Sequence, residues 1–153
     1  MIRRATMADA EAITLVHVAA IREVCGSFYR AEQIEAWVRG KAPENYVRSM
    51  ARNLFFVAEQ AYDVVGFSEL NPETGDIYAV YVRPDRLRTG LGSELLRALE
   101  ANARDRNLRR VRLHATLNAI SFYEARGYVL EAMTTFRLTP EIGLECGRMY
   151  KDV

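Results

Sequence analysis

The sequence predicts an α/β fold in which one mixed sheet and its flanking helices share a single core. Segments with helical spacing of apolar residues alternate with β-branched runs, in the order strand, helices, three strands, helix, strand, helix, two strands. A length of 153 residues suits one core, so we expect residues 1–153 to form a single domain. No repeat, linker or low-complexity segment interrupts this order.

The N-terminal half contains the expected helices and a hairpin. The motif Thr6-x-x-Asp9 is typical of a capping box that opens a helix, and apolar residues then recur at helical spacing until Gly26. The hairpin is expected to turn around Ala61-Tyr62-Asp63. The expected elements are an edge strand at 2–5, a helix that ends near 26, helices at 32–39 and 43–52, and strands at 54–59 and 64–70.

The C-terminal half begins with a β-branched and aromatic strand, a glycine-bearing turn and a long helix. Gly90 and Gly92 bracket one apolar residue, and the spacing then becomes helical. Gly127 is expected to stop a later short helix. The expected elements are strands at 77–82 and 109–115, a helix that begins at the glycine turn, a short helix from 118 to 127, and strands at 129–138 and 142–150.

The glycine turn indicates an anion site. The first turn of a helix leaves backbone N–H groups without partners, its end of the helix dipole is positive, and glycines let a ligand approach the backbone. The P-loop pattern is absent, and Leu95 stands where a third glycine would complete Gly-x-Gly-x-x-Gly. These two absences argue against a nucleoside triphosphatase and a Rossmann dehydrogenase.

A later motif narrows the choice of family. A probable strand is followed by the run Phe122-Tyr123-Glu124-Ala125-Arg126-Gly127-Tyr128. Together with the glycine turn, this run resembles the GCN5-related N-acetyltransferase (GNAT) family. Two positions depart from the family pattern: Leu87 stands at its Gln/Arg position, and Thr116 stands where many members carry Asn, with Asn118 two residues later. The matching residues are Gly90, Gly92, Phe122, Tyr123, Glu124, Gly127 and Tyr128.

The resemblance implies a mostly antiparallel sheet of six or seven strands in which two strands part at one end, leaving a wedge for the pantetheine arm of acetyl-coenzyme A. Backbone groups at 80–82 would line the pantetheine, and N–H groups at 88–93 would bind the pyrophosphate. The implied cofactor-binding residues are Val80, Tyr81, Val82, Arg88, Thr89, Gly90, Leu91, Gly92, Ser93, Asn118 and Tyr123.

Four side chains are candidates for catalysis. Tyr123 is expected to give a proton to the departing coenzyme A thiolate, because a phenol pKa of roughly 10 lies near that of an alkyl thiol. The general base stays open between three residues. Asp76 stands at the position where relatives that acetylate histones place a catalytic Glu. The other two candidates are Glu69, on the preceding strand, and His114, on the strand across the wedge.

We therefore expect an enzyme that transfers an acetyl group from acetyl-coenzyme A to a primary amine, by direct attack in a ternary complex. A non-catalytic acyl-coenzyme A sensor and a small interaction module are the alternatives. The acceptor would be an amine on a small molecule or a peptide. The sequence determines neither the length of the acyl chain nor whether the protein forms a homodimer.

Bulk composition bounds the partners and the compartment. The net charge of +1 favours neither nucleic acid nor a membrane surface as a partner. Two histidines and the lone Cys25 and Cys146 argue against a metal site. Without a signal peptide or a long apolar run, we expect the cytoplasm and reduced thiols.

Overall fold

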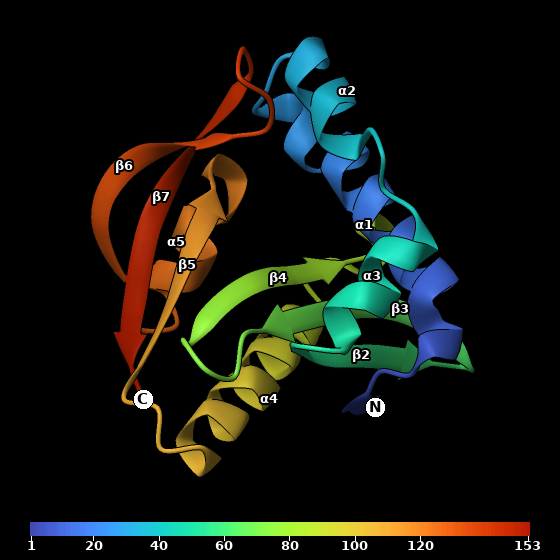
Figure 1. Ribbon diagram of the computed structural model, residues 1–153, viewed down its shortest axis with the longest axis vertical. Coiled ribbons are helices and arrows are strands. Elements are labelled where there is room, and N and C mark those ends of the chain that lie inside the picture. The colour runs from blue at the N-terminus through green and yellow to red at the C-terminus, as the bar shows by residue number, and fades with distance from the viewer.

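The computed structural model describes residues 1–153, and its centre is a seven-stranded sheet with helices on both faces (Figure 1). The strand order is β1-β2-β3-β4-β5-β7-β6. All neighbours pair antiparallel except β4 and β5, so the predicted mixed, mostly antiparallel α/β fold is confirmed. The elements are β1 (Ile2–Arg4), α1 (Ala10–Glu23), α2 (Ala31–Val38), α3 (Pro43–Met50), β2 (Leu54–Gln60), β3 (Asp63–Leu70), β4 (Asp76–Val82), α4 (Leu91–Asp105), β5 (Arg110–Thr116), α5 (Ile120–Glu124), β6 (Val129–Arg137) and β7 (Gly143–Asp152).

The expected elements are present, with ends that differ by a few residues. Two helices begin differently from the prediction. A 3-10 turn at Met7–Asp9 precedes α1, and another at Leu117–Ala119 precedes α5. Ala61 and Tyr62 both have positive φ, which is the conformation of a tight two-residue hairpin turn between β2 and β3.

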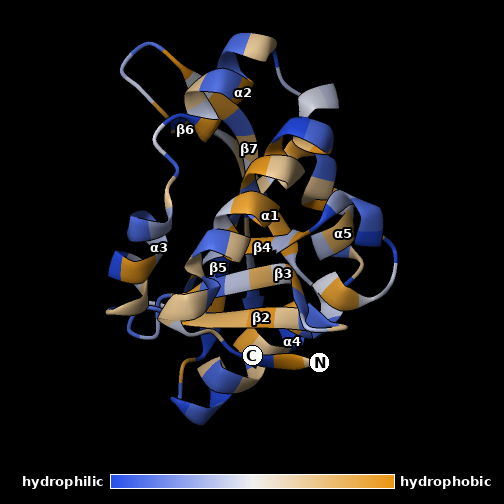
Figure 2. Ribbon diagram, turned by 90° about the vertical axis from the view of Figure 1, so that its right-hand side faces the viewer, coloured by the Kyte–Doolittle hydropathy of each residue, from blue (hydrophilic) through white to orange (hydrophobic).

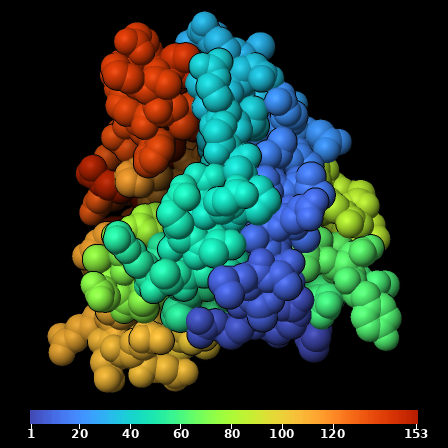
Figure 3. Space-filling model, turned by 45° about the vertical axis from the view of Figure 1, so that its right-hand side comes forward, coloured from blue at the N-terminus to red at the C-terminus, as the bar shows by residue number.

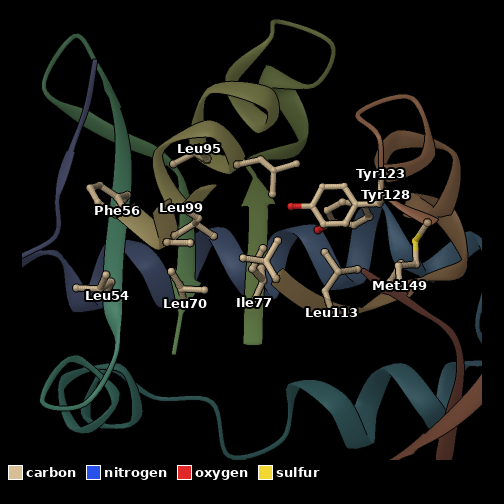
Figure 4. Close-up of a cluster of buried hydrophobic side chains, with 14 of the residues drawn as sticks. Leu54, Phe56, Leu70, Ile77, Leu95, Leu99, Leu113, Tyr123, Tyr128 and Met149 are labelled. Carbon is tan, nitrogen blue, oxygen red and sulfur yellow. The ribbon is translucent and has the colours of Figure 1, made fainter. Parts of the chain in front are cut away.

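The apolar core occupies both faces of the sheet. The larger part lies between the strands and α4, where Leu95, Leu96 and Leu99 are fully buried. Figure 4 shows Leu95 and Leu99 within this cluster. A second part lies under α1 and α3, where Ile13 and Val16 pack on the strands. Figure 2 shows β2 as mainly apolar, in keeping with its continuous burial from Leu54 to Ala58.

A third, smaller core joins the N-terminal helices to β7. Ile34 of α2 and Leu144 of β7 are both buried in it, together with Cys25 and Tyr29. The space-filling view shows the β6–β7 end of the sheet against α2 at the top of the molecule (Figure 3).

The parallel pair β4 and β5 separates soon after it begins. Only Asp76 and Ile77 have partners on β5, namely Arg112 and Leu113, although β4 continues to Val82. Figure 1 shows the two strands diverging from this point. The predicted wedge between two parted strands is therefore confirmed.

The hydrogen-bond ladder shows which backbone groups face the wedge. The Arg83 N–H donates to the Val65 carbonyl at 2.7 Å. Because bonded pairs alternate in an antiparallel ladder, Tyr81 and Phe67 form the next bonded pair, and Val80 and Val82 turn their N–H and C=O groups away from β3. Of the three residues expected to line the pantetheine by their backbone, Val80 and Val82 face the wedge, and the polar backbone groups of Tyr81 are used by β3.

Candidate functional site

Two adjoining cavities lie in the wedge. One, of about 110 Å³, lies between β4 and β5; the other, of about 360 Å³, lies at the start of α4. Their shared lining makes them one continuous channel from the middle of the sheet to the glycine turn. The shared residues are Val24, Val80, Val82, Leu87, Asn118, Ala119 and Tyr123.

The two glycines of the turn are required for different physical reasons. Gly90 has φ +87°, a conformation that side chains with a Cβ rarely adopt, although a Cβ there would meet no atom within 4 Å. Gly92 instead lies against Phe122, whose ring would be 3.2 Å from an added Cβ. One glycine therefore shapes the turn, and the other lets α5 pack against the start of α4.

The start of α4 presents free donors to the larger cavity. The first helical hydrogen bond runs from the Glu94 N–H to the Gly90 carbonyl at 3.1 Å, so the N–H groups of Leu91, Gly92 and Ser93 have no partner within the helix. Arg88, with φ +60°, belongs to the same turn and is exposed. Donors and positive charge are the requirements of an anion site.

Arg126 adds a second cation to this end of the channel, and the sequence analysis missed it. Its guanidinium lies 3.7 Å from the centre of the Phe122 ring, and its Nε donates to the Ser93 Oγ at 2.6 Å. A further bond to the Phe122 carbonyl, at 2.7 Å, holds it in place. Its position two residues after the Phe-Tyr-Glu run was the available signal, but its contact with α4 depends on the tertiary structure.

Tyr123 lies where the sequence predicted a functional phenol. The residue is 7% exposed, its ring is 5.4 Å from that of Tyr128, and both are drawn in Figure 4. The two hydroxyls differ: Tyr128 donates to Glu100 at 3.0 Å, whereas Tyr123 has no hydrogen-bond partner in the chain and lines both cavities. Burial raises the pKa of Tyr123 above its ordinary range, so the phenol stays protonated.

Asn118 contributes an unsatisfied acceptor. Its Oδ1 is buried without a hydrogen-bond partner, and the residue lines both cavities. Buried polar atoms are normally paired, so an orphaned acceptor in a cavity wall is a place where a ligand N–H can bind.

The three base candidates are separated by the fold. Asp76 lies at the closed end of the wedge, outside the cavity lining, and accepts a bond from the Thr74 hydroxyl at 2.7 Å. His114 lines the smaller cavity from β5 and is exposed, with its ring 6.0 Å from that of Phe136. Glu69 lies on β3 opposite Ala79 and accepts a bond from the Asn53 amide at 2.8 Å.

Glu69 has the electrostatic setting of a proton acceptor. Burial raises the pKa of its carboxyl above the ordinary 4.5, while the bonds from Asn53 and Ser49 and the charge of Lys41 act in the opposite direction. Burial also lowers the pKa of Lys41, and the nearby carboxylate opposes that change. The cluster formed by Lys41, Ser49, Asn53 and Glu69 was only partly anticipated, because three of its members come from α3 and its flanking loops.

A buried histidine beside Tyr81 was not anticipated. The His17 Nδ1 lies 2.8 Å from the Tyr46 hydroxyl, and its ring centre is 4.4 Å from that of Tyr81. Its Nε2 is buried without a partner, and burial lowers the pKa of the imidazole well below 6.5. His17 occurs at helical spacing with Ile13 and Ala20, so its place on the buried face of α1 could have been found from the sequence; its contact with Tyr46 could not.

The family model of the acetyltransferase (GNAT) domain matches residues 25–137. The chain belongs to the GNAT family of acetyltransferases. The matched segment contains the glycine turn, the strands β4 and β5 that line the cavities, and the helix α5 that carries Tyr123. The resemblance to the GNAT family that the sequence predicted is therefore confirmed. No curated protein matches the chain.

Solved structures share the fold of this GNAT acetyltransferase over its whole length. A GCN5-related N-acetyltransferase from Rhodopseudomonas palustris has 28% identity and a TM-score of 0.92, covering 100% of this chain and 95% of the other. The PaiA N-acetyltransferase from Thermoplasma acidophilum, in complex with coenzyme A, has 22% identity and a TM-score of 0.84, with 100% and 98% covered. YncA from Salmonella typhimurium, with acetyl-CoA, has 21% identity and a TM-score of 0.73, with 99% and 92% covered.

Two further observations concern features that the structure does not contain. No group of three or more His, Cys, Asp or Glu residues is arranged to hold a metal ion. None of the helices combines the length and the apolar character needed to cross a bilayer.

Proposed function

We propose that residues 1–153 act as one acetyl-coenzyme A-dependent N-acetyltransferase domain, which moves an acetyl group to a primary amine. The observation that carries this proposal is the unpaired part of β4. From Tyr78 to Val82 the strand has no partner on its β5 side, and the polar groups of Val80 and Val82 face a channel that ends at the donors of α4. The coenzyme A and acetyl-CoA complexes of the two structural neighbours support a thioester in this channel.

The channel fits the chemistry of coenzyme A along its length. A pantetheine arm carries two amides, which would pair with the free backbone groups of Val80 and Val82 like an added strand. Asn118 would accept a further N–H. The N–H groups from Gly90 to Ser93 would hold the pyrophosphate, and Arg88 would add positive charge.

The Tyr123 hydroxyl is proposed to supply the proton that the leaving sulfur needs. Its hydroxyl is free, it lines the inner and outer parts of the channel, and its raised pKa keeps the proton on the phenol until a thiolate forms nearby. The amine nitrogen forms a bond to the acetyl carbon as the carbon–sulfur bond breaks, the phenol proton passes to sulfur, and the proton lost by the amine must reach a base.

Direct attack by the amine fits the surroundings of the only cysteine in the cavity wall. Cys25 is buried, and burial raises the pKa of its thiol to about 11. A thiol in this state is a poor nucleophile, since the thiolate is the reactive form. A ternary complex is therefore favoured over an acetylated cysteine intermediate.

For the base, the geometry favours Glu69 and His114 over Asp76. His114 lines the cavity and is open to solvent, whereas Glu69 has the raised pKa but lies outside the cavity lining, on β3 opposite Ala79 of β4. Asp76 is proposed as a turn residue that bonds with Thr74. The acceptor amine, a small molecule or a peptide, is proposed to enter from the β5 side that His114 faces.

Acetyl-coenzyme A binding and amine-dependent thiol release test the function together. At about 100 times its dissociation constant, the ligand should stabilise the fold by roughly 2.7 kcal/mol, which raises the melting temperature by about 5–11 °C at this size. Thiol release that requires both acetyl-coenzyme A and an amine would identify the enzyme. Binding without amine-dependent release would instead support an acyl-coenzyme A sensor, and no stabilisation of a folded protein would support an interaction module.

A further inference from the structure

A polar groove borders the cavity between β4 and β5, on the side of the sheet that α3 covers (Figure 1). Its walls come from the C-terminal part of α3, the loop that leads to β2 and the turn between β3 and β4. Tyr78 lines both the groove and the cavity, so the two spaces are neighbours and this residue is their common wall.

The position of Tyr78 follows from an irregularity in the sheet. Glu69 of β3 pairs with Ala79 of β4. The next residue of β3, Leu70, pairs with Ile77, so β4 has one extra residue at Tyr78. Such a bulge turns a side chain away from the regular pleat. The Tyr78 side chain is 55% exposed, and solvent therefore reaches the border between the groove and the cavity.

Charge distinguishes the two spaces. The lining of the cavity contains no aspartate, glutamate, lysine or arginine. The groove contains Arg48 and Arg52, which are both exposed and have no ion-pair partner in the chain. Glu73 is the one carboxylate in the lining of the groove. A charged group of an acceptor thus has no counter-ion in the cavity, whereas an anion has two in the groove.

The two arginines lie one turn apart. The backbone keeps turning where α3 ends: the Ala51 N–H donates to the Arg48 carbonyl at 3.2 Å. The Arg52 N–H then donates to the Ser49 carbonyl at 3.0 Å. Like charges four residues apart in a helical turn repel each other, so this pair weakens the local fold unless an anion lies between the two groups. Guanidinium groups bind carboxylate and phosphate through two parallel hydrogen bonds.

We infer that this groove binds an anionic group of the acceptor, so that the substrate is a primary amine that also carries a carboxylate or a phosphate. The inference rests on the proposed acetyl transfer and names the substrate class of that reaction. The anion would lie between Arg48 and Arg52. The amine would lie past Tyr78, in the cavity that faces the unpaired part of β4.

Glu69 lies between the two parts of this site. Its carboxylate accepts a bond from Asn53, which lines the groove. On the sheet it lies opposite Ala79, which lines the cavity. A base candidate in this place is close to an amine whose anionic end is held in the groove. The charge of Lys41 acts on the same carboxyl, so the surroundings of Glu69 also contain a cation.

Matched acceptors test the substrate class. The members of each pair differ in the anion: β-alanine and its amide, γ-aminobutyrate and its amide, and O-phosphoethanolamine and ethanolamine. With acetyl-coenzyme A, we expect kcat/KM for thiol release to be roughly 10–100-fold higher for the anionic member, mainly through a lower KM, because hydrogen bonds between charged groups are the strong ones. The carboxylate and phosphate pairs show which of the two anions the groove prefers.

Variants of the groove locate the preference. Arg48→Gln and Arg52→Gln should each remove most of it, and Arg52→Lys should keep part of it because the charge remains. Arg106→Gln is the matched control and should keep the wild-type preference. Arg106 is exposed, has no ion-pair partner and lies outside the groove and both cavities. Acetyl-coenzyme A should stabilise all four variants as it does the wild type, which shows that the fold and the cofactor site are intact.

The possible failures of this inference and of the proposed function differ. Thiol release at equal kcat/KM for the two members of every pair would overturn the inference and leave the acetyltransferase in place. A preference that survives in both glutamine variants of the groove, or one that Arg106→Gln also removes, would overturn it as well. Absence of thiol release with every amine, neutral or anionic, would instead overturn the proposed function and this inference together.

Discussion

Replacement of Gly90 by Glu separates the phosphate site from the rest of the fold. In the structure a Cβ at Gly90 meets no atom within 4 Å, so the chain itself has room for the side chain. The variant changes two other things: it forces an L residue to φ +87°, and it places a carboxylate where the pyrophosphate is proposed to bind. We expect a folded protein that no longer binds acetyl-coenzyme A.

Gly40 offers a matched control for the strain. It has φ +79°, a Cβ there also meets nothing within 4 Å, and it lies outside the lining of both cavities. An L residue in this conformation costs roughly 1–2 kcal/mol. At this chain length, Gly90→Glu and Gly40→Glu should each lower the melting temperature by about 2–8 °C in the absence of ligand.

The ligand then distinguishes the two variants. Two unit charges about 4 Å apart repel by about 4 kcal/mol at an effective dielectric constant of 20, which corresponds to a loss of roughly three decades in affinity. A ligand concentration that raises the wild-type melting temperature by about 5–11 °C should do the same for Gly40→Glu. It should leave Gly90→Glu unchanged. Equal stabilisation of both variants by acetyl-coenzyme A would refute the phosphate assignment.

Three further predictions concern single side chains. Tyr123→Phe should lower the turnover number by about 10²–10⁴-fold with little change in acetyl-coenzyme A affinity, measured by thiol release and by thermal shift; unchanged turnover would rule out its acid role. If Glu69 is the base, kcat/KM should fall as the pH drops through a pKa above 4.5, and Glu69→Gln should abolish that limb while His114 variants keep it. The reverse pattern would favour His114. For His17, whose folded pKa is depressed, the unfolded chain gains a proton below pH 6.5 and the folded chain does not, so the free energy of unfolding should fall by up to about 1.4 kcal/mol per pH unit below 6.5. Urea unfolding measured from pH 7 to pH 5 gives the free energy of unfolding at each pH. This free energy should depend less steeply on pH in His17→Gln than in the wild type, and the same pH dependence in both would contradict the argument.

Short-range sequence information was enough for the elements and for the family. Helical spacing and β-branched runs located the strands and helices, because periodicity is imposed by which side of an element meets the core. The glycine turn and the Tyr123 helix carry their signal within a few residues, since a φ of +87° at Gly90 and the stop at Gly127, with φ +90°, are local backbone requirements. These motifs therefore predicted the α/β sheet and the wedge by resemblance.

The tertiary structure alone decided which of the predicted groups share a site. The hydrogen-bond partner of Arg83 on β3 determines that Val80 and Val82 face the channel, and the end of pairing at Ile77 leaves Asp76 outside it. Arg126 reaches Ser93, 33 positions earlier in the chain, and His17 reaches Tyr46, 29 positions later. Such contacts depend on how elements that are distant in the sequence pack against each other. The local sequence pattern is compatible with many such packings, and only the complete core selects one of them.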